Sequence, residues 1–127
     1  MLKHLTPVLV VEAVEPCLGF WTGALGFTKV HDIPGPDGRT LFASVERDGV
    51  EIMYQTRASV LEDGVSAKEL EGHSIVLFIT VDSLDEIETA VAGAPVVKPR
   101  HDTFYGSTEI YVREPGGNTV GFAQMSA

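Results

Sequence analysis

The end of the chain alternates apolar and polar side chains on either side of a Pro-Gly-Gly-Asn turn, a pattern typical of a β-hairpin. This hairpin runs from residue 104 to residue 124, and a five-residue loop at 114–118 sets Arg113 opposite Thr119 and Tyr111 opposite Gly121. One predicted face is apolar and carries Ile110, Val112, Val120 and Phe122. The other face carries Glu109, Tyr111, Arg113 and Thr119. Helices cover the apolar face of such a sheet, so we expect function on the polar face.

A second hairpin is predicted at residues 39–57, where Asp48-Gly49 supplies the positive φ angles of a type I′ turn. Its register pairs Glu46 with Glu51 and Ser44 with Met53. The face turned toward the first helix carries Leu41, Ala43, Val45, Ile52 and Tyr54. The opposite face carries Thr40, Phe42, Ser44, Glu46, Glu51, Met53 and Gln55. Both hairpins therefore have one apolar and one polar face.

The same succession of strand, helix and strand precedes each hairpin. In the first half it is a strand at 5–11, a helix opened by Glu15-Pro16 and ended by Gly26 with Trp21 on its core face, and a strand at 27–32. In the second half it is a strand at 74–81, a helix that begins at Ser83, and a strand at 96–100. A βαβββ unit thus occurs twice, about 70 residues apart.

The predicted fold class is α+β, with one domain spanning residues 1–127. Module one covers 1–57 and module two covers 73–127. The polar stretch between them, 58–72, is expected to be a surface linker with a short helix around 66–71.

Charge and cysteine content narrow the classes of partner. The net charge of −9 argues against binding to nucleic acid or to a membrane surface, and permits attraction of a cationic ligand. The single cysteine, Cys17, excludes an intramolecular disulfide. With neither a signal-peptide pattern nor an apolar run of membrane-spanning length, we expect a cytoplasmic protein.

Two motifs give the duplicated unit a family resemblance. Phe-Trp-Thr-Gly-Ala-Leu-Gly-Phe at 20–27, and the run from Tyr105-Gly106 through Glu114-Pro115-Gly116-Gly117-Asn118, resemble the vicinal oxygen chelate superfamily, and most of all its bleomycin-resistance branch. The resemblance implies a curved mixed sheet around a cleft, with the helices on its outer face. It also implies a homodimer with ligand clefts between subunits, and a Tyr105-Gly106 segment near the cleft.

The enzymes of this superfamily hold one divalent metal with a ligand on the first and last strands of each half. The corresponding positions in this sequence are Thr6, Glu51, Val76 and Gly121. Only Glu51 can be a ligand, whereas a catalytic divalent site generally needs at least three protein ligands. His73 falls on the other face of its strand and His4 lies two residues before Thr6. We therefore expect neither a metal nor another cofactor, and interpret His31 and His101 as surface residues.

Three functions remain open from the sequence, and we assign no catalytic residue because no nucleophile motif is present. The first is a metal-free protein that sequesters a flat, aromatic or cationic small molecule in a dimer cleft. Its candidate ligand-binding residues are Phe42, Ser44, Glu51, Met53, Phe104, Tyr105, Glu109 and Tyr111. The alternative is a metal-dependent enzyme of the glyoxalase or dioxygenase type, in which Glu51 and a histidine, His4 or His73, form a rearranged site. A domain that acts through protein contacts alone is a third possibility.

Overall fold

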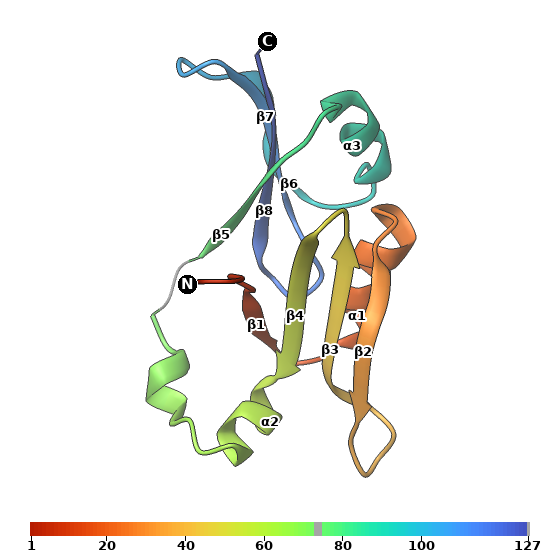
Figure 1. Cartoon of the computed structure of the whole chain (residues 1–127), viewed down its shortest axis with the longest axis vertical. Coiled ribbons are helices and arrows are strands. Elements are labelled where there is room, and N and C mark those ends of the chain that lie inside the picture. The colour runs from red at the N-terminus through yellow and green to blue at the C-terminus, as the bar shows by residue number, and fades with distance from the viewer. Residues whose placement is uncertain (73–74, 127) are drawn as a thin grey trace. The chain divides into compact units, whose positions relative to one another are not determined.

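The computed structural model describes residues 1–72 and 75–126. The chain divides into two compact units, Met1–Gly72 and His73–Ala127. Each unit holds one mixed four-stranded sheet with helices beside it (Figure 1). The predicted α+β fold of two tandem modules is therefore confirmed.

The first unit contains β1 (Val8–Val11), α1 (Glu15–Gly19), a π-helical turn η1 (Phe20–Ala24), β2 (Thr28–Pro34), β3 (Thr40–Arg47) and β4 (Val50–Thr56). Its strands lie in the order β1-β4-β3-β2. Strand β1 is parallel to β4, and the other neighbours are antiparallel. This is one βαβββ module, followed by α2 (Arg57–Glu62) and a 3₁₀ turn, η2 (Ala67–Leu70).

The second unit contains β5 (Val76–Thr80), α3 (Leu84–Ala90), β6 (Val96–Asp102), β7 (Ser107–Arg113) and β8 (Thr119–Met125). The strand order is β5-β8-β7-β6, again with one parallel pair, β5 and β8. The order of strands and the position of the parallel pair match those of the first unit. The predicted repeat is thus present in the sheets themselves.

Both hairpins have the predicted register. Asp48 and Gly49 have φ angles of 52° and 83°, as a type I′ turn requires, and Glu46 pairs with Glu51. In the second hairpin Arg113 pairs with Thr119 and Tyr111 pairs with Gly121. Turn chemistry was therefore sufficient to predict the register of both hairpins.

The core of each unit lies between its helix and the apolar face of its sheet. In the first unit Trp21 is fully buried and its indole Nε1 donates a hydrogen bond of 2.8 Å to the hydroxyl of Tyr54. In the second unit the buried Leu84 of α3 is preceded by Ser83, whose hydroxyl accepts a hydrogen bond from the backbone N–H of Glu86 and caps the helix. The apolar hairpin residues Ile110, Val112, Val120 and Phe122 are all buried.

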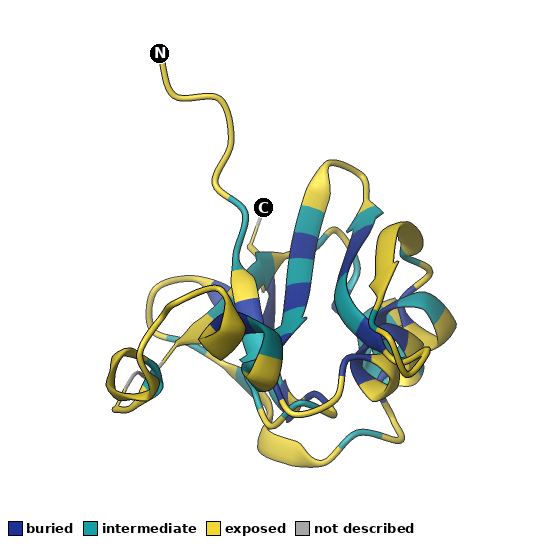
Figure 2. Cartoon of the chain, turned by 90° about the horizontal axis from the view of Figure 1, so that it is seen from below, coloured by how far each residue is buried: buried dark blue, intermediate teal, exposed yellow. Residues whose placement is uncertain are grey.

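Some element boundaries differ from the predicted ones. Strand β1 begins at Val8, because residues 1–5 are exposed (Figure 2) and Pro7 has no backbone N–H to give to a sheet. The predicted linker begins with helix α2, which Thr56 caps by accepting a hydrogen bond of 3.1 Å from the N–H of Ser59. Residue 74, the predicted start of the fifth strand, lies outside the described residues.

The helices of the described chain are too short to span a bilayer.

Candidate ligand-binding pocket

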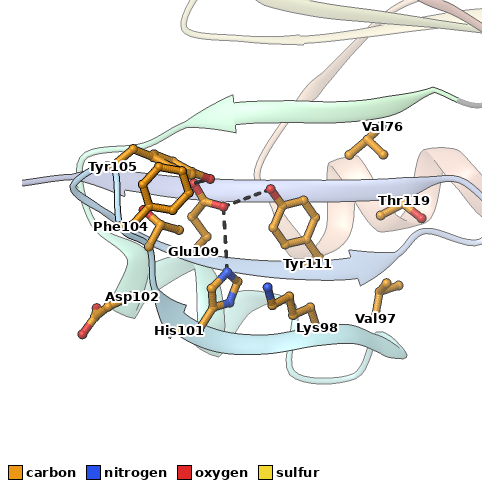
Figure 3. A pocket seen from close by; sticks show the side chains of 11 residues that line it. Val76, Val97, Lys98, His101, Asp102, Phe104, Tyr105, Glu109, Tyr111 and Thr119 are labelled. Carbon is orange, nitrogen blue, oxygen red and sulfur yellow. Dashed lines mark hydrogen bonds and ion pairs between the residues drawn. The ribbon is translucent and has the colours of Figure 1, made fainter.

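A pocket of about 570 Å³ lies on the polar side of the second unit's sheet (Figure 3). Strands β5, β6, β7 and β8 and the turn before β7 all contribute to its walls. The lining residues are Val76, Val97, Lys98, His101, Asp102, Thr103, Phe104, Tyr105, Glu109, Tyr111 and Thr119. Its volume falls in the range typical of sites for small organic molecules.

The carboxylate of Glu109 is the centre of the polar network in this pocket. Glu109 is only 1% exposed, although alternation along β7 places it on the polar face. Its Oε2 accepts hydrogen bonds of 2.7 Å from the hydroxyls of Tyr105 and Ser107. Its Oε1 accepts one of 2.9 Å from the hydroxyl of Tyr111 and lies 4.0 Å from Nε2 of His101. Figure 3 shows the contacts of Tyr111 and His101 with this carboxylate as dashed lines.

These hydrogen bonds keep Glu109 ionised and both phenols protonated. Burial acts to raise the pKa of Glu109, but the hydrogen bonds from Ser107, Tyr105 and Tyr111 and the nearby His101 outweigh it, so that the pKa lies below its ordinary value. Burial, followed by the hydrogen bond to Glu109, raises the pKa of Tyr111 to about 12. The hydrogen bond to Glu109, followed by burial, raises that of Tyr105. The pKa values of all three groups are thus shifted further from neutral pH, whereas efficient proton transfer favours a pKa near neutral pH.

His101 is held in one orientation by strand β6. Its Nδ1 lies 2.7 Å from the carbonyl oxygen of Pro99, and its ring stacks on Tyr111 with centroids 6.2 Å apart and an interplanar angle of 20°. A carbonyl oxygen only accepts hydrogen bonds, so Nδ1 must carry the proton. The other ring nitrogen, Nε2, therefore faces Glu109 with its lone pair when the ring is neutral.

The ring of Tyr111 occupies space that Gly121 leaves free on the neighbouring strand. A Cβ atom built on Gly121 would fall against Cε2 of Tyr111 and lie 2.8 Å from Cδ2 and 2.9 Å from Cζ. Because real Cβ atoms do not approach so closely, any larger residue at position 121 would displace the ring. The absence of a side chain at Gly121 thus helps to set the position of the Tyr111 hydroxyl.

The structure brings together half of the residues predicted for the site. Phe104, Tyr105, Glu109 and Tyr111 line the pocket in the second unit. The other four, Phe42, Ser44, Glu51 and Met53, lie on β3 and β4 of the first unit, outside this lining. Ser44 is fully buried, and its Oγ has no hydrogen-bond partner among the residues that the structure describes. Glu51 accepts a long hydrogen bond of 3.4 Å from Thr6.

Sequence reasoning missed the contribution of strand β6. His101, interpreted as a surface residue, is only partly exposed and lines the pocket with Val97 and Lys98. His101 reaches the pocket because it pairs with Glu109 across strands β6 and β7. An available signal was Pro99, because a proline inside a strand marks an edge or a bulge, where the alternation of faces breaks.

The four positions that correspond to the superfamily's metal ligands do not fit a metal. Val76 and Gly121 have no donor atom in their side chains, and the ring of Tyr111 covers Gly121. Within residues 1–72 and 75–126, no three His, Cys, Asp or Glu side chains are grouped as metal ligands would be. His4 is exposed, and His73, the other histidine considered, lies outside those residues.

The strand pairing also corrects the set of equivalent positions. Val8 pairs with Met53 in the first unit, and Phe78, 70 residues after Val8, pairs with Gly121 in the second. The counterpart of Gly121 is therefore Met53, and that of Glu51 is Thr119, which pairs with Val76. The predicted positions on β4 and β8 were counted from two hairpin turns of different length. This count shifted the predicted position in one module by two residues.

Comparisons with known proteins agree with this fold. The profile of the Glyoxalase/Bleomycin resistance protein/Dioxygenase superfamily matches residues 2–122. An uncharacterised protein of Mycobacterium bovis is 28% identical over 118 residues, which cover 90% of this chain and 78% of that protein.

Among solved structures, TioX from Micromonospora has a TM-score of 0.75 and 21% identity, with 97% of this chain and 98% of that chain covered. A glyoxalase/bleomycin resistance protein/dioxygenase from Nocardioides has a TM-score of 0.73 and 25% identity, with 99% and 85% covered. A lactoylglutathione lyase from Agrobacterium tumefaciens has a TM-score of 0.73 and 17% identity, with 96% and 92% covered. Because the profile matches nearly the whole chain, this protein belongs to the Glyoxalase/Bleomycin resistance protein/Dioxygenase superfamily.

Proposed function

We propose that the protein is a metal-free small-molecule-binding protein that sequesters a flat, aromatic or cationic ligand in the pocket of its second unit. The observation that carries this proposal is the buried carboxylate of Glu109, held by three hydroxyls on the wall of a pocket of about 570 Å³. Sequestration requires affinity only, and neither Glu109 nor Tyr111 has a pKa suited to proton transfer at neutral pH.

The chemistry of the walls suits a ligand with an aromatic body and a positive or N–H-donating end. Since Tyr105 and Tyr111 both donate to Glu109, their oxygens keep lone pairs for donors of the ligand. The carboxylate adds a full negative charge in a partly water-excluded site, where electrostatic attraction is strengthened. The aromatic ring of Phe104, 100% exposed, and that of the half-exposed Tyr105 offer faces for stacking.

The test is the Glu109→Gln variant with two probes of similar shape, an aminoacridinium dye and the uncharged acridone. A charge-assisted hydrogen bond is worth about 1.5–3 kcal/mol, so the affinity for the dye should fall about 10- to 150-fold while that for acridone changes little. Calorimetric titration measures both affinities. Thermal melts of each variant show whether the protein that is titrated is folded.

Glu51→Gln is the matched control, because it removes a carboxylate of the first unit that does not line this pocket. We expect it to leave both affinities unchanged. An equal loss of affinity for the dye and for acridone in Glu109→Gln would show that the charge of Glu109 does not contribute to binding. Near-stoichiometric zinc, nickel, manganese or iron in protein purified without chelators would contradict the metal-free proposal and favour an enzyme.

We further propose that the chain acts in the cytoplasm as a homodimer, in which the partner subunit adds a wall to the pocket so that the ligand cleft lies between subunits. Strand β5 lies at an edge of the second sheet and exposes Ile75, Val76 and Phe78 at or beside it. Exposed apolar side chains on a sheet edge favour association. Light scattering coupled to size exclusion at micromolar concentration should give twice the chain mass of 13.7 kDa. A mass equal to that of one chain would contradict the dimer.

A further inference from the structure

Two acceptors on paired positions of the neighbouring strands β6 and β7 define a narrower binding site within the pocket. Nε2 of His101 and Oε1 of Glu109 are 4.0 Å apart, and both line the pocket. With Nδ1 donating to the carbonyl of Pro99, a neutral His101 presents a lone pair at Nε2. Oε1 of Glu109 already accepts from Tyr111 and retains further acceptor capacity. Two acceptors in this arrangement repel each other until a donor group beside them gives hydrogen bonds to both.

We infer that an N–H-bearing group of a positively charged organic ligand gives hydrogen bonds to both Nε2 of His101 and Oε1 of Glu109 from the pocket side, and that the site binds it with His101 neutral. This inference rests on the proposed function and adds the chemical class of the bound group and a dependence on pH. A donor that bridges two acceptors contributes hydrogen bonds to both, whereas a ligand without a donor leaves the two acceptors opposed.

The groups around His101 determine what its protonation does. From β7, Glu109 and Tyr111 face the ring; from β6 itself, Lys98 and Asp102 line the same pocket, and Tyr105 lies in the turn between these strands. From β5 and β8 the lining residues are Val76 and Thr119, which do not ionise. Asp102 accepts a hydrogen bond of 2.8 Å from Thr108. The carboxylate of Glu109 lies 4.0 Å from Nε2.

Protonation of His101 converts Nε2 into a donor. The imidazolium then forms an ion pair with Glu109 itself, and its positive charge repels a cationic ligand. Binding thus competes with protonation, so affinity is full where the ring is neutral and decreases as the pH falls through the range in which histidine gains its charge. Over that range Glu109 stays ionised, since its pKa lies below its ordinary value.

The experiment measures the affinity for the aminoacridinium dye between about pH 8 and about pH 5, a range over which histidine changes charge. For the wild-type protein we expect a decrease of at least about tenfold. His101→Gln keeps an acceptor and cannot become charged, so its affinity should vary little over this range. Near the midpoint of the decrease, calorimetry in two buffers of different ionisation enthalpy should show up to one proton released per dye bound.

His31→Gln is the matched control, because it removes an exposed histidine of the first unit and should retain the wild-type pH dependence. An unchanged pH dependence in His101→Gln would overturn the inference, and so would displacement of the dye by equimolar Zn²⁺. Either result is distinguishable from failure of the proposed function, because that failure appears as a lack of dye binding, or of a charge-dependent loss in Glu109→Gln, at about pH 8.

Discussion

Trp21→Ala is expected to lower the free energy of unfolding by about 3–5 kcal/mol, the range typical of removing a large aromatic side chain from a core. Trp21 is 0% exposed, and its ring lies edge-on to Phe20 and Phe27 at centroid distances of 5.1 and 5.0 Å. The substitution also removes the hydrogen bond that the indole donates to Tyr54. Because this residue anchors the first helix to the sheet, the loss should appear as a lower thermal and denaturant midpoint.

Phe104→Ala provides the matched comparison, an aromatic residue replaced by alanine at a position that is 100% exposed. Its effect on stability should stay within about 0.5 kcal/mol, as for most surface substitutions. The folded fraction of Trp21→Ala should bind the aminoacridinium dye as the wild type does. A variant of native stability that does not bind the dye would instead make Trp21 a residue of a binding site.

The fold could be predicted in detail wherever turn chemistry is unambiguous. Asp48-Gly49 admits one type of tight turn, so the pairing of Glu46 with Glu51 followed from it. Ser83 likewise marked the start of α3. The π-helical turn at Phe20–Ala24 carries no such signal, because the residue spacing that buries Trp21 is compatible with a regular helix.

The site was predictable on β7 and in the turn before it, because unbroken alternation placed Glu109 and Tyr111 on one face. Alternation fails on β6, where the register with β7 shifts between Val96 and Lys98 and again before His101. Each irregularity changes the face that later residues occupy, so His101 could not be placed by counting. The buried state of Ser44 was not predicted either, and no described partner of its hydroxyl accounts for it.

Gly121→Ala is expected to destabilise the protein by about 1–3 kcal/mol and to abolish most of the charge-dependent dye binding. The added methyl group would lie within 3 Å of the Tyr111 ring, at 2.8 Å from Cδ2 and 2.9 Å from Cζ. The ring must therefore move, and its hydroxyl then loses the hydrogen bond of 2.9 Å to Glu109 and its stacking on His101. The backbone itself accepts alanine, because Gly121 does not have a positive φ.

A double-mutant cycle separates this steric effect from a simple intolerance of alanine in β8. In a Tyr111→Ala background the methyl group meets no ring, so Gly121→Ala should be neutral or slightly stabilising, as glycine weakens a strand by about 0.5–1 kcal/mol. The coupling free energy between the two positions should then be at least about 1 kcal/mol, within the range measured for residues in contact. Gly19→Ala in α1, where an added Cβ meets nothing within 4 Å, controls for the gain of a methyl group. An equal cost of Gly121→Ala in both backgrounds would show that Tyr111 does not depend on the space at Gly121, and the ring position would then need another cause.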